Sequence, residues 1–143
     1  MKKTILPLLS FMLLGGNLIA QTFSKDSTSK QVHKGYKESI FPGGKEAWIN
    51  YVQSNVNGAL GKYILNPKGL PKVQQSAYVT FKVDKDGSIT DVVVTNAAEL
   101  NPKLVEEALR VIKSSPKWTP AMSDGEFITE KGMQTITWEH GKK

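Results

Sequence analysis

Residues Tyr78 to Thr95 alternate between apolar and polar side chains in the way that two joined β-strands do. The first strand has the period of two expected of a half-buried strand, with one apolar face formed by Val79, Phe81 and Val83. Asp84 to Gly87 provides turn chemistry, because aspartate caps local N–H groups and glycine accepts a positive φ. The second strand is predicted from Ile89 to Thr95, with Val92 and Val94 on one face. A lone hairpin is marginal in water, so other segments must cover its apolar face.

Two segments carry apolar residues at helical spacing and are predicted to be amphipathic helices. The first, residues 45–56, follows a Phe-Pro-Gly-Gly boundary and has an apolar stripe of Trp48, Ile49, Val52 and Val56. Asn57-Gly58 is a plausible end for it. The second begins at Asn101-Pro102, with Asn as the cap and Pro at the first helical position. Its stripe is Leu104, Val105, Ala108, Leu109 and Ile112, and it ends at Ser114-Ser115-Pro116.

The remaining segments complete a small sheet. Residues 59–76 contain two glycines and two prolines, which exclude a long regular element. A loop with Asp124-Gly125 leads to a last strand over 131–139, where Ile136 and Trp138 face one way and Thr135 and Thr137 the other. The order helix, hairpin, helix, strand predicts an α+β two-layer domain. It consists of a three-stranded antiparallel sheet covered on one face by two helices.

The N-terminus predicts export. Residues 1–20 have a Lys-Lys start, an apolar run and a small residue, Ala20, before a cleavage point, which is typical of a secretory signal. An uncleaved inner-membrane anchor is the alternative, although the apolar run is shorter than the roughly 20 residues that a span needs. Residues 21–40 are polar and are expected to be a flexible linker, and 41–140 the folded domain. We expect a periplasmic protein with no stable membrane span once the signal is removed.

The amino-acid composition argues against several kinds of binding site and activity. The formal charge of +6 comes from lysines spread along the chain, and no recognition motif suggests nucleic-acid binding. The absence of cysteine excludes disulfides, thiolate metal sites and a lipid-modified N-terminal cysteine. Only two histidines occur, His33 in the linker and His140 near the C-terminus, which is too few for a zinc site. We therefore expect no metal, no cofactor and no enzymatic activity.

Three weaker patterns favour structural roles. Asp84, Asp86 and Gly87 begin like a calcium loop, but no glutamate closes it, so a turn is favoured. Glu106 and Glu107 are expected on the solvated side of the second helix. Burial is also expected for the three tryptophans, with Trp118 lying largely under the second helix; the alternative is a ligand platform. The three are Trp48, Trp118 and Trp138.

Several stretches together resemble the C-terminal domain of TonB-like energy transducers, in the form common among Bacteroidetes. They are Phe41-Pro42-Gly43-Gly44, the run from Val79 to Val92, Glu107 to Ile112, and Pro116-Lys117-Trp118 with Pro120. The resemblance covers about Phe41 to Glu139 and implies a periplasmic, non-enzymatic module linked to transmembrane transport. It also implies a partner, a segment of an outer-membrane TonB-dependent receptor. Full transducers keep a membrane anchor and a long proline-rich spacer, so we expect a stand-alone exported domain here.

In that family the last strand is a sheet edge that pairs with a segment of the receptor. The partner-binding edge that the resemblance implies is Met133, Gln134, Thr135, Ile136, Thr137, Trp138 and Glu139. The same edge could instead pair with its own copy in a homodimer. The alternative function is binding of cell-wall material or a small ligand in an aromatic cleft near Trp118 and Trp138.

Overall fold

The computed structural model describes residues 35–66 and 68–141. The predicted signal, most of the linker and His33 lie outside the described residues. The elements in chain order are α1 (Gly44–Asn55), the 3₁₀ helix η2 (Gly58–Tyr63), β1 (Lys72–Val83), β2 (Ile89–Val94), the 3₁₀ helix η3 (Ala97–Glu99), α2 (Pro102–Lys113), β3 (Ala121–Ser123), β4 (Glu126–Ile128) and β5 (Glu130–Gly141). The chain has the predicted α+β class.

The central strand is β1, which pairs with β2 on one side and with β5 on the other, both antiparallel. The predicted hairpin is confirmed: Asp84 N–H donates to Ser88 O at 2.9 Å, and Gly87 closes the turn with φ 84°. One extra residue in β2 shifts the register between Thr80 and Lys82, and Asp91 takes φ 49° at this bulge. The three-stranded sheet therefore has the order β2-β1-β5.

The strand β1 is longer than the sequence pattern predicted. It begins at Lys72, whereas we expected Tyr78, and its first half pairs residue by residue with the end of β5, from Lys72 with Gly141 to Ala77 with Ile136. Before it, Gly58–Tyr63 forms a short 3₁₀ helix in the stretch from which only a long regular element was excluded. Asn57 caps this helix by accepting the Ala59 N–H at 3.1 Å. The exclusion of a long regular element over residues 59–76 is wrong from Lys72 onward, where β1 begins.

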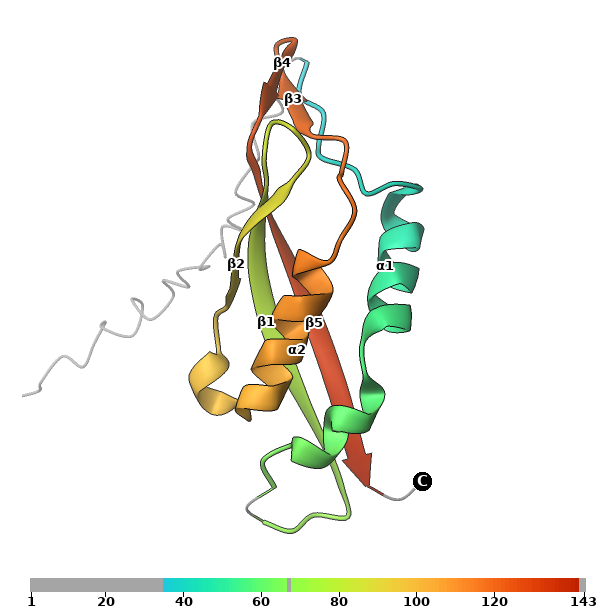
Figure 1. The fold of residues 1–143 in the computed structure, drawn as a ribbon, viewed down its shortest axis with the longest axis vertical. Helices are drawn as coiled ribbons and strands as arrows, with labels where there is room; N and C mark the ends of the chain where they lie inside the picture. Colours follow the sequence, from blue (N-terminus) through green and yellow to red (C-terminus); the bar gives the residue numbers. More distant parts are fainter. Residues whose placement is uncertain (1–34, 67, 142–143) are drawn as a thin grey trace, which may run out of the picture. The chain divides into compact units, whose positions relative to one another are not determined.

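Two α-helices cover one face of the sheet. In Figure 1, α2 crosses in front of β1 and β5, and α1 runs alongside β5. The predicted cap is confirmed, since the Asn101 side chain accepts the Lys103 N–H at 3.0 Å, with Pro102 as the first helical residue. The core lies between the helices and the sheet, and its most deeply buried large side chains are Trp138, Leu104, Ile112, Val79, Val83 and Val111.

The prediction for Glu107 is wrong. Glu106 is exposed, but Glu107 is buried among the core side chains of α2, with 8% of its surface exposed. A buried carboxylate needs partners, and Glu107 has two: the Arg110 guanidinium and the backbone N–H of Asn57. The pairing with an arginine one turn further along α2 is the reason that the burial is tolerated.

A second, two-stranded sheet interrupts the loop that was expected before the last strand. β3 and β4 pair through a tight turn in which Asp124 has φ 51° and Gly125 φ 86°. Two consecutive positive φ angles are the signature of a type I′ hairpin turn, for which Asp-Gly is a favoured sequence. The segment before α1 adds to this end of the molecule, since Lys37 bridges to Met122 and Ile40 to Thr119.

Candidate functional site

The predicted partner-binding residues all lie on β5, the strand that forms one edge of the three-stranded sheet. Their side chains alternate as expected. Ile136 and Trp138 are buried toward the helices, Gln134 is half-buried on the same side, and four residues are exposed: Met133, Thr135, Thr137 and Glu139. Met133 is the most exposed large apolar side chain of the described residues, at 71%.

The direction of the backbone groups of β5 follows from the hydrogen bonds of β1. Tyr78 uses both of its backbone groups on the β2 side, because its carbonyl accepts the Thr95 N–H at 2.8 Å and its N–H donates to Asn96 Oδ1 at 3.0 Å. Alternate residues of an antiparallel strand point their N–H and C=O groups to opposite sides. Ala77 and Val79 therefore direct these groups toward β5.

The partners of Ala77 and Val79 in β5 are Ile136 and Gln134. These two residues consequently exchange backbone hydrogen bonds with β1. The intervening residues direct their N–H and C=O groups away from the sheet: Met133, Thr135, Thr137 and Glu139. Within residues 35–66 and 68–141, no strand pairs with this outer side of β5.

The outer edge is closed at its C-terminal end. A Cβ atom added to Gly61 in η2 would stand 2.1 Å from the Glu139 carbonyl oxygen, so η2 packs directly against that outward group. Only glycine permits such a close approach. At the other end, the Glu130 carboxylate accepts hydrogen bonds from Tyr36 Oη, Ser39 N–H and Ser39 Oγ. The accessible part of the edge is thus Met133 to Thr137.

A groove of about 400 Å³ runs between α1 and this accessible part of the edge. The β5 side is formed by Gln134 to Thr137, and the helical side by residues of α1 and the turn that follows it: Ile49, Val52, Gln53, Val56 and Gly58. None of these residues is charged. An extended chain placed beside β5 would direct every second side chain into this uncharged groove.

The Gln134 side chain lies at the groove and links α1 to the edge. Its Oε1 accepts the indole N–H of Trp48 at 2.7 Å, and its Nε2 donates to the carbonyl of Thr135 at 2.7 Å. Trp48 is itself buried, with 8% of its surface exposed. Nothing in the alternation of β5 along the sequence indicates these contacts.

The connection after α1 is held by groups from α2 and β5. The Asn57 N–H donates to Glu107 Oε1 at 2.8 Å, and the Asn57 carbonyl accepts the Trp138 indole N–H at 3.2 Å. Arg110 donates to Glu107 and, through Nη2, to Asn55 O at 2.6 Å. These bonds fix the end of α1 relative to β5, and with it the width of the groove.

The same bonds hold the pKa of the Glu107 carboxyl below its ordinary value. The hydrogen bonds from Arg110 are the largest cause; burial opposes them, and the Asn57 N–H and the positive charge of Arg110 add to the lowering. Glu107 is therefore ionised in the folded protein at neutral pH, as an acceptor of three hydrogen bonds must be. Its role is to hold two segments together, since all of its partners are groups of the protein itself.

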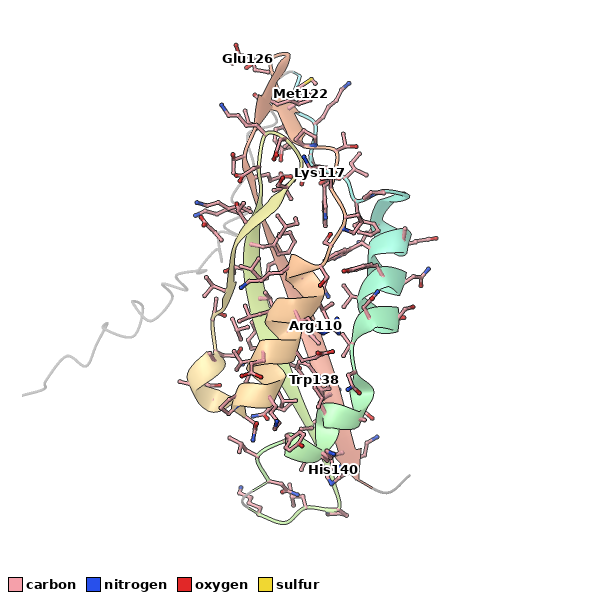
Figure 2. The ribbon with its side chains drawn as sticks, viewed as in Figure 1. Arg110, Lys117, Met122, Glu126, Trp138 and His140 are labelled. Carbon is pink, nitrogen blue, oxygen red and sulfur yellow. The ribbon has the colours of Figure 1, made fainter. Side chains whose placement is uncertain are left out.

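The aromatic cleft suggested for Trp118 and Trp138 is not formed. Trp138 pairs with Gln75 in β1, whereas Trp118 donates its backbone N–H to Gly87, beyond the other end of that strand. At ~3.3 Å per residue, the strand from residue 75 to 83 alone spans about 26 Å. Figure 2 likewise places Lys117 and Trp138 far apart along the sheet.

Trp118 is half-buried. The prediction that it lies largely under α2 is therefore wrong. Its ring packs against Phe41, Trp48 and Phe81, with ring centroids 5.0 to 5.8 Å away, and its indole N–H donates to Ser115 at 2.9 Å. The chain turns away at the end of α2, and Trp118 is carried toward the hairpin turn at Gly87. It closes the core beside α1.

Hydrogen bonds between its own residues stabilise the acidic turn between β1 and β2. The Asp86 carboxylate accepts hydrogen bonds from the backbone N–H and the hydroxyl of Ser88, at 3.0 and 2.8 Å. These bonds stabilise the turn, and they direct the carboxylate oxygens of Asp86 at groups of the turn itself. Across the described ranges, no cluster of three or more acidic or histidine side chains is arranged to hold a metal ion.

The described residues form a small α+β domain whose sheet edge at β5 is accessible beside an uncharged groove. The family model for the C-terminal domain of the Gram-negative bacterial TonB protein matches residues 72–140. This part of the chain, from the start of β1 almost to the end of β5, belongs to that family. Helix α1, which forms the far wall of the groove, precedes the matched residues. No curated protein matches the chain.

The family of residues 72–140 indicates the general function of this part of the chain. TonB C-terminal domains are periplasmic interaction modules without enzymatic activity, and they are linked to transport through outer-membrane receptors. Over residues 35–66 and 68–141, no helix combines the length and the apolar character needed to cross a membrane.

Proposed function

We propose that this domain binds an extended segment of an outer-membrane TonB-dependent transporter by strand addition to β5, as part of transmembrane transport. The observation that supports this best is the set of outward N–H and C=O groups between Met133 and Thr137. An added strand would satisfy these groups with main-chain hydrogen bonds, while the groove beside α1 would receive its inward side chains. The family of residues 72–140 supports the choice of a receptor as the partner.

We further propose that the domain works as an exported periplasmic protein, with the signal removed near Ala20. An exported protein of this kind would act on receptors as an adaptor, a competitor or a modulator. Pairing of β5 with a second copy of itself would use the same groups, so self-association competes with receptor binding in this proposal.

The experiment compares two proline substitutions in neighbouring residues. Thr135→Pro removes an N–H that points outward, so the fold should survive and receptor binding should weaken. Ile136→Pro removes an N–H that pairs with Ala77 and also a buried side chain, so this variant should lose stability. Binding is measured by capture of receptors from outer-membrane extract and by titration with peptides that tile their periplasmic segments.

Two results would argue against the proposal. One is a folded Thr135→Pro domain that captures receptors as well as the native domain does. The other is a native domain that captures no receptor but sediments as a dimer at the concentration used, which would favour self-pairing of the edge.

A further inference from the structure

We propose that Gln134 is a gate on the edge strand: its side-chain amide occupies the Thr135 carbonyl, and a binding strand must displace it. This inference rests on the proposed function, because the gated group is part of the same edge. It assigns a regulatory and selective role to a residue whose place in β5 otherwise suggests only pairing with Val79.

The geometry of the amide carries the argument. Gln134 Nε2 lies 2.7 Å from the Thr135 carbonyl oxygen, which points away from the sheet. The N–H of a strand added to this edge would be directed at the same oxygen, at a distance close to 2.9 Å, so it would compete with the amide for this acceptor. The amide thus satisfies in the free protein an acceptor that an added strand would use. The described part of the chain holds no competing donor to this carbonyl.

The chemistry of the two neighbours suits an amide at this position. The indole N–H of Trp48 can only donate, and the Thr135 carbonyl can only accept. A side chain that lies between them must accept at one end and donate at the other, which glutamine does and glutamate or methionine does not. Because Trp48 is buried and anchored in the core, it also sets the orientation in which Nε2 faces Thr135.

Such a gate solves a problem that exposed edges create. An open row of backbone groups invites pairing with any extended chain, including another copy of the same protein. Other proteins protect edges with charged residues or prolines, but these would also exclude the intended partner. An amide hydrogen bond can be exchanged for a backbone one, so it selects for segments that gain enough in the groove to displace it.

The test compares Gln134→Met with the native domain against one set of peptides that tile the periplasmic segments of outer-membrane receptors. Methionine keeps the length of the side chain but cannot donate to Thr135. Since a net hydrogen bond corresponds to about 2- to 10-fold in an equilibrium constant, we expect the variant to bind about 2- to 10-fold more tightly. Gln134→Leu, which also cannot donate to Thr135 and adds no charge to the edge, should show the same direction if the methionine variant folds poorly.

A matched control is Gln74→Met, which makes the same chemical change on β1, outside the groove. The Gln74 side chain is exposed and makes no hydrogen bond within the described residues, so its replacement should leave the affinity within about 2-fold of the native value. The indole N–H resonance of Trp48 gives a second readout. It should move when peptide binds to the native domain, because Gln134 then leaves its acceptor position.

The outcomes separate the gate from the proposed function. Tighter binding by the Gln134 variants, or binding by them alone, supports the gate. Equal or weaker binding by folded variants, together with an unmoved Trp48 indole resonance in the native domain, overturns the gate and leaves strand addition intact. If no peptide of the set binds the native domain or any variant, the proposed function fails and the gate falls with it.

Discussion

Replacing Glu107 tests how the connection after α1 is held, and the structure allows the effect to be estimated. Glu107→Ala removes an acceptor for the Asn57 N–H at 2.8 Å and for two nitrogen atoms of Arg110 at 2.7 and 2.8 Å. A hydrogen bond to a buried charged group contributes about 1.5–3 kcal/mol. The Arg110 side chain is 50% exposed, so its ion pair is screened and adds only about 0.5–1 kcal/mol. The free energy of unfolding should therefore fall by about 2–4 kcal/mol.

The assay is urea denaturation followed by tryptophan fluorescence, with Glu106→Ala as the control. Glu106 is the neighbouring glutamate, but it is exposed, so its replacement should change the free energy of unfolding by less than about 0.5 kcal/mol. Glu107→Gln, which can still accept the Asn57 N–H, should lie between the two alanine variants. A loss below about 1 kcal/mol for Glu107→Ala would show that the network does not hold α1 in place.

The pH dependence of the same measurement has a defined sign. A carboxyl group whose pKa is lowered by folding stabilises the folded state above its unfolded pKa and loses this effect as pH falls through the folded pKa. The pKa of Glu107 lies below its ordinary value of 4.5 in the folded domain. The difference in stability between the native domain and Glu107→Gln should be constant above about pH 5 and should shrink as the pH falls below about 4.5. A difference that grows on acidification would contradict this assignment.

Three further outcomes are expected. Trp118→Ala should lower the free energy of unfolding by about 2–4 kcal/mol, somewhat less than a fully buried tryptophan, because the ring is half-buried; a loss below about 1 kcal/mol in urea would contradict its place in the core. Gly61→Ala should cost at least about 1–3 kcal/mol in the same assay, since its Cβ would stand 2.1 Å from the Glu139 carbonyl, and an unchanged midpoint would refute that contact. The exported protein should have the intact mass of a chain that starts at Gln21, and recovery of the full precursor in the inner-membrane fraction would overturn this.

The elements with strong local patterns were predictable from the sequence. The alternation from Val79 to Val83, the aspartate-rich turn and the Asn-Pro start of α2 each have one physical solution, and the structure has all three. The first half of β1 was not predictable in this way. Residues 72–77 (KVQQSA) are mostly polar, and they are extended because they pair along the end of β5, a contact between residues 59 to 69 positions apart.

Some features missed at first were present in the spacing. Glu107 lies three residues after Leu104 and four before Val111, so it belongs to the buried stripe of α2 despite its charge. The Asp124-Gly125 pair predicts a tight hairpin, but strands of three residues are too short to show a period. The gate at Gln134 depends on Trp48, 86 residues earlier, and no local pattern reports it.

The proposal that β5 accepts an added strand is tested most directly by the amide resonances of the edge itself. In a titration of the isotope-labelled native domain with a captured receptor segment, the N–H groups of Met133, Thr135 and Thr137 should shift and become protected from hydrogen exchange. The N–H groups of Gln134 and Ile136, which already pair with β1, should be protected before the peptide is added. Saturable binding that leaves the three outward amides unshifted and unprotected would contradict strand addition at this edge.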